Sequence, residues 1–140
     1  MNEEYSRQSL PSRKYRELLG SAICVFNSNN SFVIENILRN DEGNDYNWHE
    51  LIDYPSGELS QPIKETISRL SGRKIASCFS EIVNMRNRIV HSFQITIDDE
   101  QILATKQRNG KQFRITEDYL YDFVQKNDEL SMLLHEFRGY

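Results

Sequence analysis

Residues 81–93 read EIVNMRNRIVHSF, and their apolar positions recur at the spacing of an α-helix. With the preceding turns they form a seam at steps of 4, 3, 7 and 4, made of Ile75, Phe79, Ile82, Ile89 and Phe93. Arg86 stands in this seam where an apolar side chain is expected. A half-buried cation costs free energy unless an anion meets it, so Arg86 is a candidate functional residue.

A polar stripe follows the other side of this helix. Asn84, Asn87 and His91 are spaced by three and four residues, so Asn87 and His91 can touch. Arg86 and His91 are five residues apart, which places them about 140° apart around the axis. One helix does not readily direct both side chains at one atom. The length of the arginine, a helix end at His91 or a second copy of the helix would have to close the gap.

The chemistry that these residues suit is RNA cleavage without a metal. A histidine titrates near neutral pH, so His91 can exchange a proton with a ribose 2′-hydroxyl or a leaving 5′-oxygen. The Arg86 guanidinium can stabilise the extra negative charge of a pentacoordinate phosphorane, and Asn87 can orient either group. The alternative is structural: Arg86 pairs with a carboxylate of a neighbouring helix, and His91 is a solvated helix end.

The motif of Arg86, the polar Asn87 and His91 resembles the Arg-x(4–6)-His motif of the HEPN superfamily. The resemblance covers residues 73–93 and, more loosely, the order of helices over the chain. It implies a helical bundle that usually dimerises, so that two motifs share one cleft. Many members are metal-independent endoribonucleases that act as toxins or in antiviral defence. Some relatives carry a tyrosine that a partner nucleotidyltransferase modifies, and here Phe93 stands at that position.

Two other classes of function stay open. One is a catalytically silent HEPN-like module that binds RNA, a nucleotide or a partner protein. The other is a helical antitoxin, immunity or adaptor protein, which predicts a buried carboxylate beside Arg86. The expected partners of the enzyme are RNA, a second copy of the chain, and a cognate antitoxin or sensor protein.

Basic residues concentrate around the motif. Residues 64–114 carry ten Lys or Arg and five Asp or Glu, a net charge of +5, whereas the rest of the chain carries −9. This distribution favours a local phosphate-binding surface on an acidic protein, although the same charges can simply solvate helix and hairpin surfaces. The residues expected to hold RNA are Arg88, Arg73, Lys74, Lys106, Arg108 and Lys111.

Composition indicates one domain over residues 1–140, with residues 1–10 expected to be flexible. Mean hydropathy is −0.66, no run of 18 apolar residues occurs, and the N-terminus shows no secretory signal pattern. Cys24 and Cys78 lie among apolar residues, which predicts buried free thiols of a cytoplasmic protein. No spacing of Cys and His suggests zinc, and no Gly-rich phosphate loop occurs, so no metal or cofactor is expected.

The expected fold is mainly α, a HEPN-like bundle with a small β-hairpin or three-stranded insertion between the motif helix and the last helix. Helix signals occur from Pro11 to a break at residues 27–31, over residues 32–39 after a capping Ser31, over 48–53, over 60–70 with Ser60 as cap, in the motif helix after Gly72, and after Thr116. Alternating apolar residues predict strands over 93–97, 102–105 and 112–115, with a tight turn at 108–111.

Overall fold

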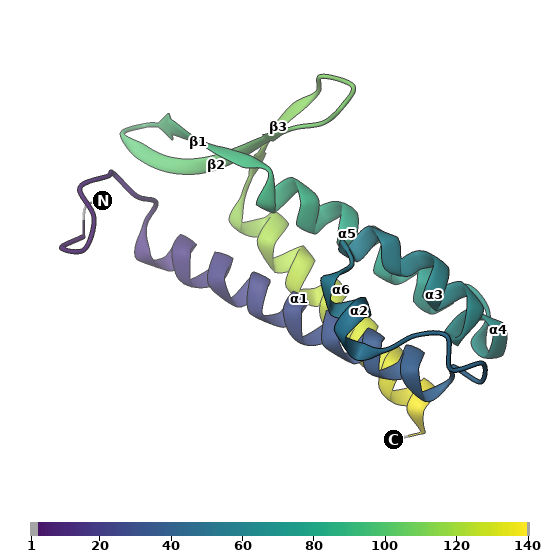
Figure 1. The fold of residues 1–140 in the computed structure, drawn as a ribbon. Helices are drawn as coiled ribbons and strands as arrows, with labels where there is room; N and C mark the ends of the chain where they lie inside the picture. Colours follow the sequence, from purple (N-terminus) through teal and green to yellow (C-terminus); the bar gives the residue numbers. More distant parts are fainter. Residues whose placement is uncertain (1–2, 140) are drawn as a thin grey trace.

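The computed structural model describes residues 3–139 and has the expected mainly helical architecture (Figure 1). In the sequence, a small sheet lies between the motif helix α5 and the last helix α6. The elements in chain order are α1 (Arg13–Arg39), α2 (Trp48–Asp53), the 3₁₀ helix η1 (Ser56–Leu59), α3 (Ser60–Glu65), α4 (Ile67–Ser71), α5 (Lys74–Val90), β1 (Ser92–Ile97), β2 (Glu100–Lys106), β3 (Gln112–Ile115) and α6 (Glu117–Arg138).

Helices α1 and α6 run in the same direction, and α5 runs against them (Figure 1). Near the start of α1, the hydroxyl of Tyr15 donates to the carbonyl of Ile115, 2.5 Å away, just before α6 begins. Near their ends, Arg138 of α6 pairs with Glu35 of α1 at 2.5 Å. The short helices α2 to α4 then bring the chain back to the start of α5 at the far end of the bundle.

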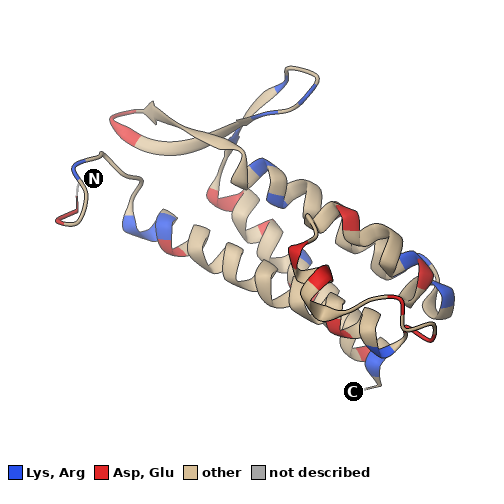
Figure 2. Ribbon diagram, viewed as in Figure 1, with Lys and Arg blue, Asp and Glu red and all other residues tan. Residues whose placement is uncertain are grey.

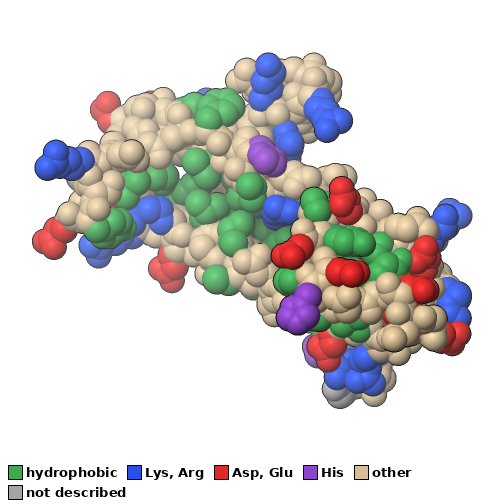
Figure 3. All heavy atoms as spheres, viewed as in Figure 1, with side chains coloured by type: hydrophobic (Ala, Val, Ile, Leu, Met, Phe, Trp, Pro, Cys, Tyr) green, Lys and Arg blue, Asp and Glu red, His purple; other side chains and the backbone are tan. Residues whose placement is uncertain are grey.

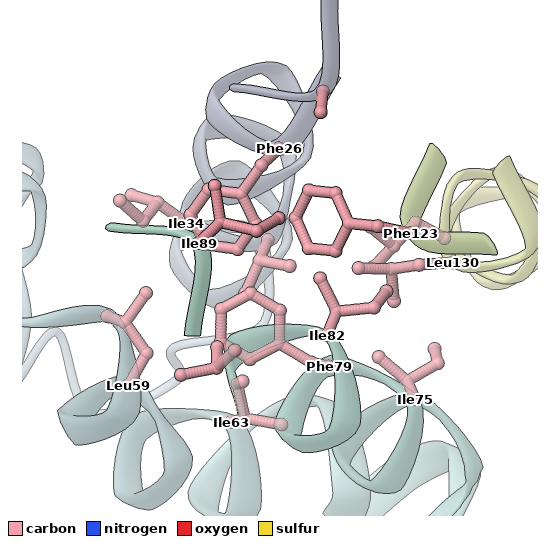
Figure 4. Close-up of a cluster of buried hydrophobic side chains, with 14 of the residues drawn as sticks. Phe26, Ile34, Leu59, Ile63, Ile75, Phe79, Ile82, Ile89, Phe123 and Leu130 are labelled. Atoms are coloured by element: carbon pink, nitrogen blue, oxygen red, sulfur yellow. The ribbon is translucent and has the colours of Figure 1, made fainter. Parts of the chain in front are cut away.

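Three stacked phenylalanines form the centre of the core (Figure 4). The ring of Phe26 from α1 lies 6.4 Å from that of Phe79 in α5 and 6.2 Å from that of Phe123 in α6, measured between centroids. Offset stacking of buried rings stabilises by both area and ring geometry. This cluster therefore fixes α5 against the other two long helices.

The sheet is antiparallel with strand order β1-β2-β3, and it lies at the end of the bundle where α5 finishes (Figure 1). Asp98 and Asp99, with φ of 50° and 64°, make the two-residue connection from β1 to β2. Both central residues of a type I′ hairpin turn need positive φ, which Asp tolerates. The turn predicted at residues 108–111 lies one residue earlier: the N–H of Gly110 donates to the carbonyl of Gln107 at 2.9 Å, and Gly110 has a positive φ of 89°.

The predicted break in the first helix is wrong, because α1 continues without interruption through residues 27–31. Polar side chains in this segment form hydrogen bonds with residues on other elements, and do not compete with the hydrogen bonds of their own helix backbone. The Nδ2 of Asn29 donates to both oxygens of Asn127 on α6, and the Oδ1 of Asn30 accepts from the hydroxyl of Ser56. Ser31 consequently lies inside α1 and caps no second helix.

The helix predicted over residues 60–70 is two short helices, α3 and α4, which meet at Thr66. The buried hydroxyl of Thr66 donates to the carbonyl of Pro62 at 2.7 Å, and this local bond accompanies the break. Ser60 is the first residue of α3 and makes no capping hydrogen bond. The predicted role of Ser60 as a cap is therefore wrong.

Two further predictions of burial need correction. Phe93 does not continue the helical seam, because α5 ends at Val90 and Phe93 lies on β1 with 43% of its surface exposed. The side chain of Cys24 is exposed, not buried, and that of Cys78 is half-buried. Burial raises the pKa of the Cys78 thiol.

The segment before α1 lies against that helix. The carboxylate of Glu3 pairs with Arg13 at 3.1 Å and with Arg16 at 2.6 Å. Residues 1 and 2 lie outside the described residues, and the flexibility expected for residues 1–10 stays a prediction. Within residues 3–139, no helix is long and apolar enough to cross a membrane.

Candidate active site

Helix α5 carries the motif and buries one side of itself. It begins after Gly72, whose φ of 81° ends α4. The predicted seam residues Ile75, Phe79, Ile82 and Ile89 are buried against the neighbouring helices. This packing fixes the rotation of α5, and thereby the direction in which each residue of the motif leaves it.

Arg86 lies between α5 and α1, half-buried in the seam. Its guanidinium carbon is 5.1 Å from the centroid of the Phe26 ring, a cation–π contact with a ring of the central cluster. The Nε atom is buried without a hydrogen-bond partner, and no ion pair of Arg86 exists among residues 3–139. Burial therefore lowers the pKa of Arg86, with no anion to offset it.

His91 caps the C-terminal end of α5, and its side chain is exposed. Its backbone N–H donates to the carbonyl of Asn87 at 2.9 Å, so the last turn of the helix links the two residues. The side chain of Asn87 is half-buried. An exposed imidazole at a helix end is accessible to a substrate, and the neighbouring amide lies one turn away on the same side.

The fold does not bring Arg86 and His91 onto one side of α5. Arg86 is turned toward Phe26 of α1, whereas the spacing of five residues sends His91 about 140° away around the axis. No hydrogen bond joins the two side chains within the part of the chain that the structure describes. In a single copy, the motif therefore presents two separate groups.

The cations predicted to bind RNA fall into two groups, one at each end of α5 (Figure 2). Beside His91, Arg88 donates to the carbonyl of Lys106 at 2.6 Å and so joins α5 to the end of β2. Lys106 is exposed, as are Arg108 and Lys111 in the turn that follows. Arg88 therefore has a structural role that sequence reasoning missed, and its binding of RNA stays a prediction.

Arg73 and Lys74 lie at the other end of α5, and both side chains are exposed. The 18 residues from Arg73 to His91 correspond to about 27 Å along a helix axis. These two cations therefore cannot contact the same phosphate as His91 in one copy. They lie at the opposite end of α5 from His91, beside α4.

Apolar side chains remain exposed on both sides of His91 in the sequence. Val90 is 50% exposed and Phe93 is 43% exposed. Figure 3 shows further hydrophobic side chains gathered between the N-terminal half of α1 and the sheet. A contiguous group of exposed apolar side chains is typical of a surface that a partner covers.

Sequence reasoning also missed Phe26 as the platform under Arg86. The sequence predicted Phe26 as part of an apolar helix face, but a contact between residues 60 positions apart leaves no local signal.

Among the described residues, no three His, Cys, Asp or Glu side chains are grouped as metal ligands would be.

Comparison of the chain with protein-family models, with curated proteins and with solved structures found no match. The likeness to the HEPN superfamily accordingly rests on the motif in α5 and its helical setting.

Proposed function

We propose that the protein is a metal-independent endoribonuclease of the HEPN type. The observation that carries the proposal is the state of Arg86: a half-buried guanidinium over Phe26 without an anionic partner among the described residues. A cation held in this way is already partly desolvated, so it interacts strongly with a phosphate that approaches it. The structural alternative predicts a buried carboxylate beside Arg86, and none forms an ion pair with it in residues 3–139.

The proposed reaction begins with the 2′-hydroxyl next to the scissile phosphate. His91 accepts the proton of this hydroxyl, and the oxygen attacks phosphorus to form a phosphorane whose added charge Arg86 stabilises. The bond from phosphorus to the 5′-oxygen then breaks, and that oxygen takes a proton from a second imidazole or from water. The products are a 2′,3′-cyclic phosphate and a 5′-hydroxyl. Asn87 orients the imidazole or donates to the phosphate.

A second copy of the chain completes the site in this proposal. Arg86 and His91 leave one helix on different sides, so a symmetric partner has to supply the missing group from its own α5. The exposed apolar side chains of Val90 and Phe93 beside His91 support such a contact. Arg88, Lys106, Arg108 and Lys111 then hold the RNA strand near the cleft.

The proposed setting is a cytoplasmic toxin or antiviral-defence system, with a cognate antitoxin or sensor protein controlling the enzyme. The exposed Val90 and Phe93 also favour a second candidate, a catalytically silent module or adaptor whose partner is another protein. Cleavage of RNA by the purified protein separates the two, because a silent module lacks it.

The test compares wild type with His91→Ala and with His49→Ala, which removes another exposed histidine on α2. We expect wild type and His49→Ala to cleave RNA in EDTA and to leave 2′,3′-cyclic phosphate ends, which RNA-end mapping detects. His91→Ala should reduce the cleavage rate by at least about 100-fold. A deoxyribose at the cleaved position should block the reaction. Unchanged cleavage by folded His91→Ala would falsify the assignment of the site.

A further inference from the structure

A groove of about 900 Å³ runs between α3–α4 and α5, away from the Arg86 seam. Lys64 and Arg69 line one bank, and Arg73, Ser77 and Asn84 follow the other bank along α5. The lining residues follow the two helical segments lengthwise, so the groove is elongated along α5.

The charge of the groove is positive and largely unpaired. Lys64 and Arg73 are exposed and form no ion pair in residues 3–139. Arg69 has only a long contact, 3.6 Å, with the exposed Glu42. The one acid in the lining, Glu81, pairs with Lys126 at 2.7 Å. Lys64 and Arg73 thus face each other across the groove without a matching acid, which favours an anionic ligand.

Neutral donors accompany these cations. The hydroxyls of Ser77 and Ser80 and the amide of Asn84 are exposed along the α5 bank. On the other bank Ser68 lines the groove, but its hydroxyl is buried and is not one of these donors. Hydroxyl and amide donors next to Lys and Arg are the groups that proteins use to contact phosphates and sugars.

The groove points toward His91. From Arg73 the α5 bank continues to Ser77, Asn84 and His91 at steps of 4, 7 and 7, which keeps these residues on one side of the helix. The seven residues from Asn84 to His91 correspond to about 10 Å along the axis. A strand that lies in the groove therefore leads to the imidazole without crossing the apolar seam.

We propose that this groove binds single-stranded RNA and guides it to His91, with Lys64 and Arg73 contacting backbone phosphates on opposite banks. The inference rests on the proposed function for the choice of RNA and for the role of His91. The groove itself is supported independently by the unpaired Lys64 and Arg73, by the hydroxyl and amide donors along it, and by its direction. The net charge of −9 outside residues 64–114 would confine the strand to this path.

The first test measures binding of a labelled 2′-O-methyl RNA of about 12 nucleotides, which cannot react through its 2′-oxygen. Fluorescence anisotropy with the full chain compares wild type, Lys64→Gln/Arg73→Gln and the control Arg7→Gln/Arg39→Gln. Both double variants change the net charge from −4 to −6. Arg7 and Arg39 are exposed and lie outside the groove.

The groove variant should raise Kd about tenfold, and the slope of log K against log salt should fall by about 1.4, at about 0.7 per phosphate contact. The control should stay close to wild type. Equal weakening in both double variants would show a general effect of charge and would overturn the proposal. Binding by the groove variant as tight as that of wild type would overturn it as well.

A second variant tests the groove without removing a cation. Ser77→Glu places an acid in the first turns of α5, where negative charge stabilises a helix. The melting temperature should therefore stay the same or rise while Kd for RNA increases several-fold. Ser77→Gln, of similar size and neutral, should bind as wild type does. Unchanged binding by Ser77→Glu counts against the groove.

These experiments separate the inference from the proposed function. Binding of the 2′-O-methyl RNA tests Lys64 and Arg73, whereas cleavage of ordinary RNA tests His91. If wild type binds through Lys64 and Arg73 but cleaves no RNA, the nuclease proposal fails and the groove stands. If wild type cleaves RNA and the groove variant binds and cleaves equally well, the groove proposal fails and the nuclease stands.

Discussion

Arg86 is the residue at which stability and the proposed function conflict, because a cation at this position costs folding free energy but can stabilise a phosphate. Its contact with Phe26 contributes about 0.5–2 kcal/mol, the range for a cation over a ring between exposed and desolvated sites. Leaving a buried donor such as its Nε unpaired costs about 1–3 kcal/mol. The balance is unfavourable to folding, so a structural reason for a charge at this position is missing.

Replacement of Arg86 by methionine should therefore stabilise the protein and abolish cleavage. Methionine fills a similar space over Phe26 and needs no partner, so the free energy of unfolding should rise by about 1 kcal/mol. Thermal unfolding should then shift upward by about 4 °C. The control Arg88→Met should lose stability, because it breaks the hydrogen bond to the Lys106 carbonyl. A lower melting temperature for Arg86→Met would mean that the cation is structural.

For single residues, the sequence predicts those features that depend only on the spacing of residues along a helix. The conflict at Arg86 and the neighbourhood of Asn87 and His91 follow from helical periodicity, and α5 has that periodicity. The exposure of Cys24 and the partner of Arg88 could not be predicted. Both depend on which other element packs nearby, and that contact joins distant parts of the chain.

At the scale of elements, the pair α1 and α6 shows how tertiary contacts override local signals. A run of Asn and Ser at residues 27–31 predicts a break, because such side chains compete for backbone hydrogen bonds. In α1 they lie along a helix that continues, since Asn29 and Asn30 find partners on α6 and η1. The Nδ2 of Asn127 in turn donates a hydrogen bond to the carbonyl of Phe123, 2.9 Å away.

The pair of Asn29 and Asn127 should contribute measurably to stability. Asn29→Ala removes both hydrogen bonds to Asn127 and leaves a buried acceptor unpaired, so it should cost about 2 kcal/mol. Asn27→Ala on the exposed side of the same helix should instead gain about 0.5 kcal/mol from helix propensity. Urea unfolding of both variants measures the difference. Equal free energies of unfolding for the two would refute the role given to the pair.

The strands were easier to predict than the helix boundaries, for a local reason. Alternating apolar residues and the sequence Arg108–Lys111 specify strands and a turn within a few positions. The division between α3 and α4 falls at the buried Thr66, whose hydroxyl donates to the carbonyl of Pro62. Burial of that threonine is set by the whole bundle, so the sequence alone indicates one helix there.

At the scale of the whole molecule, one copy of the chain does not bring the two groups of the proposed reaction together in one site. Arg86 is directed at α1, His91 is exposed at the end of α5, and Val90 and Phe93 expose apolar surface next to it. A twofold axis near His91 would cover that surface and supply the missing partner for each group. No feature of a single sequence predicts where such an axis lies.

Mixing two inactive variants tests whether the site is shared between copies. Arg86→Met keeps His91, and His91→Ala keeps Arg86, so neither homodimer has a complete site. After unfolding and joint refolding in equal amounts, half of the dimers contain both chains, and one of their two sites is whole. Cleavage should return to about a quarter of the wild-type rate if Arg86 and His91 act across the symmetry axis.

The same mixture prepared with Phe93→Glu in both chains is the control for assembly. A charge at this exposed apolar position should weaken the dimer, so sedimentation should show single chains and the recovered cleavage should disappear. Met132→Glu, at another exposed apolar position on α6, should leave assembly and recovery intact. If the mixture stays inactive while sedimentation shows mixed dimers, Arg86 and His91 of one chain act together. The proposed geometry, in which each group needs its counterpart on a second helix, would then be wrong.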